Sequence, residues 1–208
     1  MFFSRFSEYI DKLKKMDFYK VFTYFFLCAL IGWIFETTVV LLETGKLTDR
    51  GLLFVERDFN TYFSFLNNIP YIRTIPLIWG LPIIEIYGVG GIIILFSMGK
   101  FKNKIWELFF IGTFIMTLLE LATSLFCDYI LHQSFWDYSN QFMNLQGRIC
   151  LSSSLVWGLL TVFSIKYLRP KLDKIYEKEK HLKMFRQITI PVAVYTLICI
   201  LFKIFVFK

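Results

Sequence analysis

Three glutamates stand inside long apolar runs of the sequence, at Glu36, Glu85 and Glu120. A charge at the centre of a bilayer costs about 3 kcal/mol or more, so such carboxylates face a protein interior or a water-filled cavity. With a rise of about 1.5 Å per residue, Glu36 and Glu120 each lie roughly 20 Å from the same side of the membrane. Their shared depth predicts a common polar site, suited to ion pairing or to ligand binding.

Further polar residues cluster near the outer end of these runs. Arg148 and a string of polar residues lead directly into an apolar segment, while Arg50 and Asp137 fall in the adjoining loops. Arginine binds carboxylates and other anionic groups with strong, charge-assisted hydrogen bonds. For Glu120, a structural ion pair with Arg148 or Arg50 and a role in ligand binding both remain open. The expected site comprises Glu36, Arg50, Glu120, Asp137, Asn144 and Arg148.

The run that holds Glu120 has one polar face. Its residues recur at three- or four-residue spacing, which places them on one side of a helix: Thr113, Thr117, Glu120, Thr123 and Ser124. The next run carries Ser154, Gly158 and Thr161 on one face, a spacing typical of close helix packing in membranes. The hydroxyls therefore either fix packing between helices or line the site.

The elements that position these residues are expected to be membrane-spanning helices. Apolar residues make up 56% of the chain, and charges gather between long apolar runs, which excludes an ordinary soluble domain. About 20 apolar residues cross the hydrocarbon layer. The pattern predicts an all-α, polytopic transmembrane bundle of about five spans, at 21–42, 75–98, 105–128, 149–168 and 188–207. Segment 59–72 is too short to cross and is expected to lie in the interface or to re-enter.

Basic residues predict the orientation and the domain organisation. Of the 23 lysines and arginines, 16 fall on one side of the predicted membrane, which places the N-terminus inside and the C-terminus outside. Residues 1–20 read as an amphipathic interfacial helix on the cytoplasmic side. The membrane core is expected at 21–168, with four spans and an outer insertion at 55–78. A basic cytoplasmic linker at 169–187, either a solvated face or a docking surface, leads to the fifth span within 188–208.

Span two is expected to be kinked or broken. Pro82 removes a helical hydrogen bond and clashes with the preceding turn, while Gly88, Gly90 and Gly91 allow close backbone approach. A broken helix exposes backbone groups that bind ions or substrates, although close packing through small residues explains the glycines equally.

The sequence contains no pattern that predicts an enzyme, a cofactor or a metal site. No cluster has zinc-ligand spacing, no nucleophile has a recognisable base beside it, and the net charge of +7 reflects topology and attraction to lipid rather than nucleic-acid binding. An enzyme acting on a lipid-linked substrate, with Glu36 and Glu120 as acid and base, is the less favoured alternative. Cys127 and Cys150 both fall near the outer boundary and could pair.

These motifs resemble the Putative ABC-transporter type IV permease family of small bacterial membrane proteins. The resemblance covers most of residues 30–160 and rests on Gly32-Trp33 with Glu36, Asp49-Arg50-Gly51, Gly80, Pro82, Tyr87-Gly88, Glu120, Thr123-Ser124, Trp136-Asp137-Tyr138-Ser139 and Asn144–Gly158. It implies a permease-like subunit in the bacterial cytoplasmic membrane. Because the chain has no G-x-x-x-x-G-K-[ST] sequence, an ATPase would be a separate partner. Lipid and further copies of the chain are the other expected partners, and a structural or regulatory membrane protein without transport activity is the alternative.

Overall fold

The described chain forms a bundle of α-helices, which confirms the expected fold class. The computed structural model describes residues 17–45, 51–52, 81–179 and 183–206. Its principal helices are α2 (Phe18–Thr44), α4 (Glu85–Ser97), α5 (Ile105–Phe126), α6 (Leu151–Phe163), α7 (Arg169–Glu179) and α8 (Lys183–Val206). Short turns extend three of them: η4 (Met98–Phe101), η5 (Cys127–Leu131) and η6 (Ser164–Leu168). The expected helix at 1–20 and the insertion at 55–78 lie almost wholly outside the described residues, as does segment 59–72.

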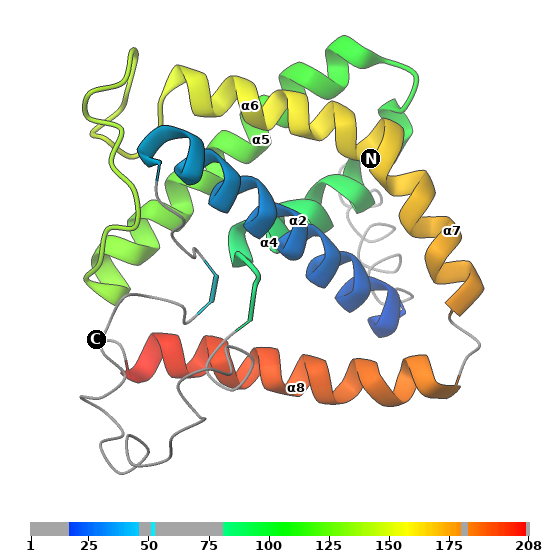
Figure 1. Cartoon of the computed structure of the whole chain (residues 1–208). Coiled ribbons are helices and arrows are strands. Elements are labelled where there is room, and N and C mark those ends of the chain that lie inside the picture. The colour runs from blue at the N-terminus through cyan, green and yellow to red at the C-terminus, as the bar shows by residue number, and fades with distance from the viewer. Residues whose placement is uncertain (1–16, 46–50, 53–80, 180–182, 207–208) are drawn as a thin grey trace, which may run out of the picture.

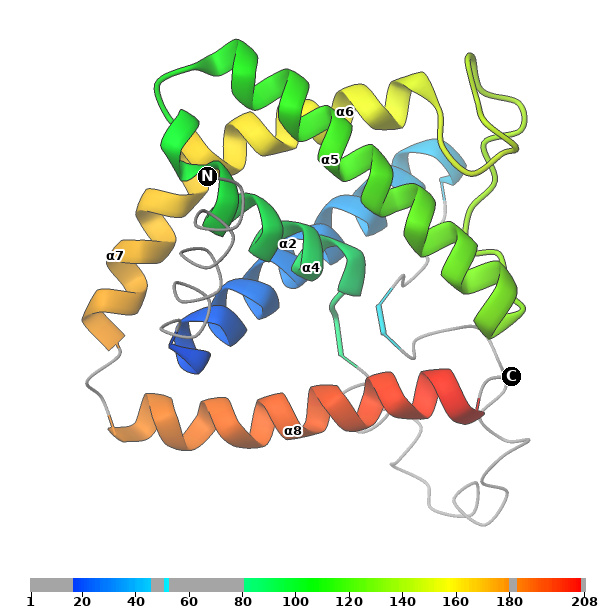
Figure 2. The same cartoon turned by 180° about the vertical axis from the view of Figure 1, so that it is seen from behind.

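Within the described residues, four stretches of helix are long and apolar enough to cross a membrane: Phe18–Leu42, Ile105–Leu131, Leu151–Lys178 and Lys183–Leu201. α2 and α4 lie between the α5–α6 pair and α8 in both views of the bundle (Figures 1 and 2). Asp17 caps the start of α2 by accepting a hydrogen bond from the Tyr19 amide, and Gly45 ends it with φ +69°. A left-handed C-terminal residue of this kind favours glycine, because glycine has no Cβ to clash.

The second expected crossing is helical over only part of its length. α4 has 13 residues, or about 20 Å of helix, and Leu81–Ile84 before it is not helical. The Leu52 amide donates to the Ile83 carbonyl (2.9 Å), and the Ile84 amide donates to the Ala29 carbonyl of α2 (3.1 Å). Pro82 explains the break, since its ring removes one amide donor and clashes with a helical turn before it. In its described part the expected span at 75–98 is therefore α-helical only over Glu85–Ser97, and the non-helical residues around Pro82 agree with the expectation of a kinked or broken helix.

The segment after α6 is also different from a solvated linker. α7 continues the helix and buries Leu172 and Tyr176 against the start of α2. Asp173 on α7 pairs with Lys20 at 2.7 Å and accepts a hydrogen bond from the Tyr24 hydroxyl. One face of this segment therefore belongs to the core, because its carboxylate and aromatic groups find their partners on α2.

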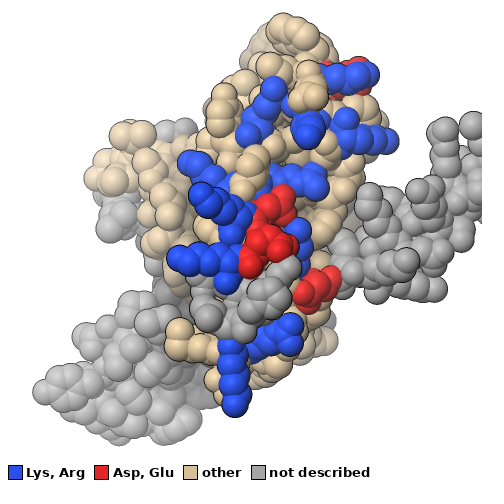
Figure 3. All heavy atoms as spheres, turned by 90° about the vertical axis from the view of Figure 1, so that its right-hand side faces the viewer, with Lys and Arg blue, Asp and Glu red and all other residues tan. Residues whose placement is uncertain are grey.

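The other face of α7 is basic and exposed. Lys171, Lys174 and Lys178 are exposed, and Figure 3 shows lysine and arginine side chains gathered around a few acidic ones on this end of the molecule. The starts of α2, α5 and α8 lie toward the same end (Figure 1). The expected concentration of basic residues on one side of the bundle is therefore present in three dimensions.

Small residues let α5 and α6 pack closely. A Cβ added at Gly158 of α6 would lie 2.2 Å from Thr113 Oγ1, and one added at Gly112 of α5 would lie 2.4 Å from Thr161 Cγ2. Both distances are far inside van der Waals contact, so only glycine fits. The small-residue stripe predicted for this helix is thus a contact surface at Gly158 and Thr161. Cys127 and Cys150, for which pairing was left open, do not form a disulfide.

Replacement of Gly158 by valine should therefore destabilise the bundle. Forcing extra carbon atoms into a packed contact costs about 1–3 kcal/mol, and this contact meets Thr113 and the ring of Phe109. Reversible unfolding of the purified protein in mixed micelles measures the loss. Leu159→Met, one residue along at a position 63% exposed, is the matched control and should stay within about 0.5 kcal/mol of the native protein. Equal stability of the two variants would contradict this packing.

Candidate functional site

Glu120 lies at the centre of a polar cluster inside the bundle. Its residue is only 4% exposed, because it belongs to the inward stripe of α5 at four-residue spacing, namely Leu108, Gly112, Met116, Glu120 and Ser124. The Tyr138 hydroxyl donates to Glu120 Oε1 at 3.2 Å, and Ser153 Oγ lies 3.1 Å from Glu120 Oε2 in hydrogen-bonding geometry. Trp157 of α6 also lies within hydrogen-bonding reach of this carboxyl group. The loop that carries Tyr138 and helix α6 therefore both meet the buried acid of α5.

A second carboxyl group joins this cluster from α2. The Tyr87 hydroxyl of α4 donates to Glu36 Oε1 at 2.7 Å, and the Tyr87 ring contacts the Trp157 ring with centroids 4.9 Å apart. Glu36 and Glu120 are close enough to interact electrostatically. We call Glu36, Tyr87, Glu120, Tyr138 and Ser153 the carboxyl–tyrosine centre. The predicted convergence of Glu36 and Glu120 is thus present, with tyrosine and serine hydroxyls as their described partners.

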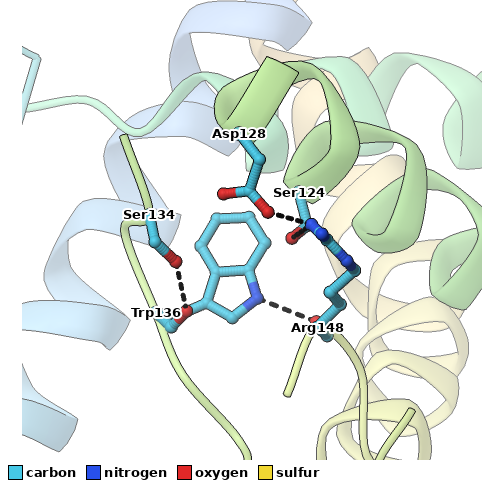
Figure 4. A network of polar contacts seen from close by, with 5 residues as sticks. All are labelled: Ser124, Asp128, Ser134, Trp136 and Arg148. Carbon is cyan, nitrogen blue, oxygen red and sulfur yellow. Dashed lines mark hydrogen bonds and ion pairs between the residues drawn. The ribbon is translucent and has the colours of Figure 1, made fainter. Parts of the chain in front are cut away.

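Arg148 occupies a different position from the one expected. Its guanidinium forms an ion pair with Asp128 and a 3.3 Å hydrogen bond to Ser124, so it closes over the end of α5 (Figure 4). Among the described residues no ion pair joins Arg148 to Glu120. The alternative of an ion pair between Glu120 and Arg148 is therefore wrong, while the alternative pair with Arg50 involves a residue outside the described part of the chain. Asp128 lies two helical turns beyond Glu120, near the end of the helix and beside Arg148.

Trp136 reinforces the Arg148 contact. Its indole Nε1 donates to the Arg148 carbonyl at 2.9 Å, and its own carbonyl accepts from the Ser134 hydroxyl at 3.0 Å. Figure 4 shows the indole lying alongside the Asp128–Arg148 pair. Arg148 Nε is buried and has no hydrogen-bond partner among the described residues. Both ends of the loop between η5 and α6 are thus fastened to the same arginine.

Asp137 and Asn144 organise this loop, residues 132–150, rather than contacting Glu120. The Asn144 amide group donates to the carbonyls of Ser139 and Gln141, and its oxygen accepts from the Gly147 amide at 3.1 Å. Gly147 has φ +69°, and a Cβ there would lie 2.6 Å from Asp137 Oδ1, so the turn requires glycine. The loop conformation in turn directs Tyr138 inward. Arg50, the sixth expected site residue, lies outside the described residues.

Asp137 and Tyr138 are neighbours in the loop, but their side chains differ in charge. The Ser139 hydroxyl and then the Ser139 amide, both donating to Asp137 Oδ1, hold the pKa of Asp137 below its ordinary value. Burial raises the pKa of Tyr138 above its ordinary value, so its hydroxyl remains a hydrogen-bond donor at neutral pH. Asp137 is therefore a charged surface group, while Tyr138 is a neutral donor directed at Glu120.

The centre borders an apolar cavity of about 70 Å³ between α2, α4, α5 and α6. Tyr87 and Trp157 line this cavity and also contact the carboxyl groups. Cys28, Gly90 and Met116 are among the other residues that line it. The glycines of span two allow close helix packing beside this cavity. A Cβ at Gly90 would lie 2.3 Å from Met116 Cε, and one at Gly91 would lie 2.5 Å from Cys28 Sγ. They bring α4 close to α5 and α2.

The residues on the predicted polar face of α5 have different roles. Thr123 donates to the Leu119 carbonyl of its own helix, and Ser124 supports Arg148. The hydroxyls of Thr113 and Thr117 are buried with no hydrogen-bond partner among the described residues, and Thr113 contacts Gly158.

Glu85, the third glutamate of the apolar runs, is the first residue of α4. Over the described part of the chain, no group of three or more His, Cys, Asp or Glu is placed to hold a metal ion.

The Arg148–Asp128 assignment predicts a specific energetic coupling. The two side chains are 17% and 28% exposed, so their pairing is only partly screened by water. In a double-mutant cycle, Arg148→Met and Asp128→Asn should show a coupling energy of about 0.5–3 kcal/mol in unfolding experiments. The matched cycle of Arg148→Met with Glu120→Gln should be additive within about 0.5 kcal/mol. A larger coupling with Glu120 than with Asp128 would contradict the assignment.

Comparison with known proteins places the chain in a family over nearly its whole length. No curated protein and no solved structure matched the chain. The model of one family, described as "Putative ABC-transporter type IV", matches residues 23–206. That range includes the four membrane-spanning stretches almost completely, together with the carboxyl–tyrosine centre and the loop that covers it. The chain is therefore a member of the family described as "Putative ABC-transporter type IV".

Proposed function

We propose that the chain is a permease-like subunit of a transport system and that the carboxyl–tyrosine centre is the polar site that its cargo or coupling ion meets. The observation that carries this proposal is the burial of Glu120, at 4% exposure, among hydroxyl groups rather than among apolar side chains. A buried acid costs stability in an apolar bundle, so its presence is more easily explained by function than by packing. Family membership supports the transport class.

The geometry suggests how such a site would be reached. Tyr87 and Trp157 border both the carboxyl groups and the apolar cavity, so rotation of either ring would join the two. On the outer side, the loop 132–150 covers Glu120 through Tyr138 and is braced by Arg148 on Asp128. In this proposal, the loop closes the outer end of the path and the two aromatic rings separate the site from the cavity.

A separate ATPase is the partner that this function calls for. The chain has no phosphate-binding G-x-x-x-x-G-K-[ST] sequence, so it would use ATP only through another subunit. The basic face of α7, with exposed Lys171, Lys174 and Lys178, is the surface we assign to the cytoplasmic side, where it would meet that subunit or anionic lipid. The N-terminus would then lie inside and the C-terminus outside, in the bacterial cytoplasmic membrane. Self-association would enlarge the small bundle.

A structural or regulatory membrane protein is the second candidate. It is favoured by the closed form of the Arg148 contacts, in which Asp128, Ser124 and Trp136 all have partners. On this alternative, the same contacts would only hold the loop and helices together. It predicts that neutral, isosteric replacements in the centre change stability and nothing else.

Gentle purification of the tagged protein from its native membrane, followed by mass spectrometry of retained proteins and small molecules, tests the proposal. We expect a stoichiometric ATPase, and transport by the reconstituted pair that falls at least tenfold in Glu36→Gln and Glu120→Gln. Glu107→Gln is the matched control, because Glu107 lies in the first turn of α5, at the opposite end of the helix from Glu120, and pairs there with Lys104. Undiminished transport in both glutamine variants, or a chain that retains neither an ATPase nor a small molecule, would contradict the proposal.

A further inference from the structure

We propose that Glu120 is a proton-binding site, protonated at neutral pH, whose proton completes the hydrogen bonds between Ser153 and Cys150 at the start of α6. This inference rests on the proposed function, because it names the ion that the carboxyl–tyrosine centre would bind.

Burial disfavours a charge on Glu120. The residue is 4% exposed in the middle of Ile105–Leu131, a stretch apolar enough to cross a membrane. Ionised carboxylates in such surroundings require a cation or several strong donors. Over the part of the chain that the structure describes, no ion pair reaches Glu120, and Arg148 is already engaged by Asp128. A neutral acid avoids the cost of an uncompensated charge.

The contacts of Ser153 fit a protonated Glu120. A hydroxyl has one hydrogen to donate and two lone pairs to accept with. Ser153 Oγ lies 3.1 Å from the Cys150 carbonyl and 3.1 Å from Glu120 Oε2, and it accepts the Cys150 amide at 3.4 Å. If Glu120 is protonated at Oε2, it donates to Ser153, which donates to the Cys150 carbonyl, and all three contacts are made at once. If Glu120 is ionised, two acceptors compete for one hydrogen.

The remaining contacts of Glu120 are compatible with this state. Tyr138 donates to Oε1 whether or not Oε2 carries a proton. Among the described residues, the titratable groups that face Glu120 are Glu36 of α2, Tyr87 of α4, Tyr138 of the loop and Cys150 before α6, and none of these is a cation. Glu36 has the like charge when ionised, and two nearby carboxyl groups do not both ionise easily. Since Glu36 is less buried than Glu120, the proton belongs on Glu120.

Deprotonation would act on the start of α6. Ser153 and Cys150 form the capping box of that helix, and an ionised Glu120 would draw the Ser153 hydrogen away from the Cys150 carbonyl. The Cys150 carbonyl keeps the Ser154 amide in either state, so the helix would loosen at its first turn without unfolding. Repulsion from Glu36 would add to this effect. The loop that Tyr138 fastens to Glu120 is directly attached to that turn.

Infrared spectroscopy of the full-length protein in lipid nanodiscs tests this inference without any transport assay. A neutral carboxylic acid has a C=O stretching band that is distinct from those of carboxylates. We expect this band at neutral pH and its loss in strongly alkaline buffer. Glu120→Gln should remove it, and the matched variant Glu36→Gln should retain it. The glutamine at 120 can still accept from Tyr138 and donate to Ser153, so this variant should fold.

Tyr138→Phe supplies an independent readout. It removes the donor to the Glu120 carbonyl oxygen, so the band should remain and move to higher frequency. Absence of the band at neutral and mildly acidic pH, or its persistence in Glu120→Gln, would overturn the inference. A band with the expected behaviour in a protein without transport activity would instead contradict the proposed function alone. Transport that needs Glu120 without any such band would contradict the proton site alone.

Discussion

The structure depends on one constraint: polar groups inside an apolar bundle must find their partners within the protein. Glu120 illustrates it most clearly, because it sits on the inward stripe of α5 and receives donors from a loop and from α6. The loop 132–150 has its shape because of this requirement. Its own turns, held by Asn144 and by Gly147 at positive φ, direct Tyr138 toward the buried acid, and Arg148 fixes the end of the loop to Asp128.

The same constraint acts at the other end of the bundle. There, Lys20 of α2 forms an ion pair with Asp173 of α7. The Tyr24 hydroxyl donates a hydrogen bond to Asp173, and the Tyr176 hydroxyl donates one to Asp17. A tyrosine can place an aromatic ring in an apolar core while its hydroxyl group reaches a carboxylate. Tyrosine–carboxylate contacts thus join helices on both sides of the molecule, and between them the core is made of apolar side chains and close glycine contacts.

Much of the fold was predictable from the sequence, because hydrophobic length and helical spacing depend on local properties. The depths of Glu36 and Glu120, the contact face of α6 and the break near Pro82 follow from such patterns. The partners of these groups do not. Trp136 and Tyr138 lie in a loop beside the end of a span, where aromatic residues ordinarily anchor the membrane interface, yet both reach the site because the loop folds inward. Asp128 was overlooked as the partner of Arg148, since at the end of a span it resembles an ordinary flanking charge.

Two elements depend on tertiary contacts as well as on local pattern. Pro82 is a local signal for the break before α4, but the course of Leu81–Ile84 is held by backbone partners on Leu52 and Ala29. The basic segment around α7 has enough charge to suggest a solvated linker, but Leu172 and Tyr176 find apolar partners across the bundle. No local pattern in the sequence encodes these partners.

Hydrogen–deuterium exchange of the full-length protein in nanodiscs most directly tests the claim that the loop 132–150 is an integral part of the buried polar site. The amides of Tyr138, Leu145 and Arg148 donate to backbone carbonyls of the same loop at 2.8–3.0 Å. The account predicts that peptides covering these residues exchange slowly, as do those at the end of α5. Exchange at the rate of an unstructured peptide would contradict it.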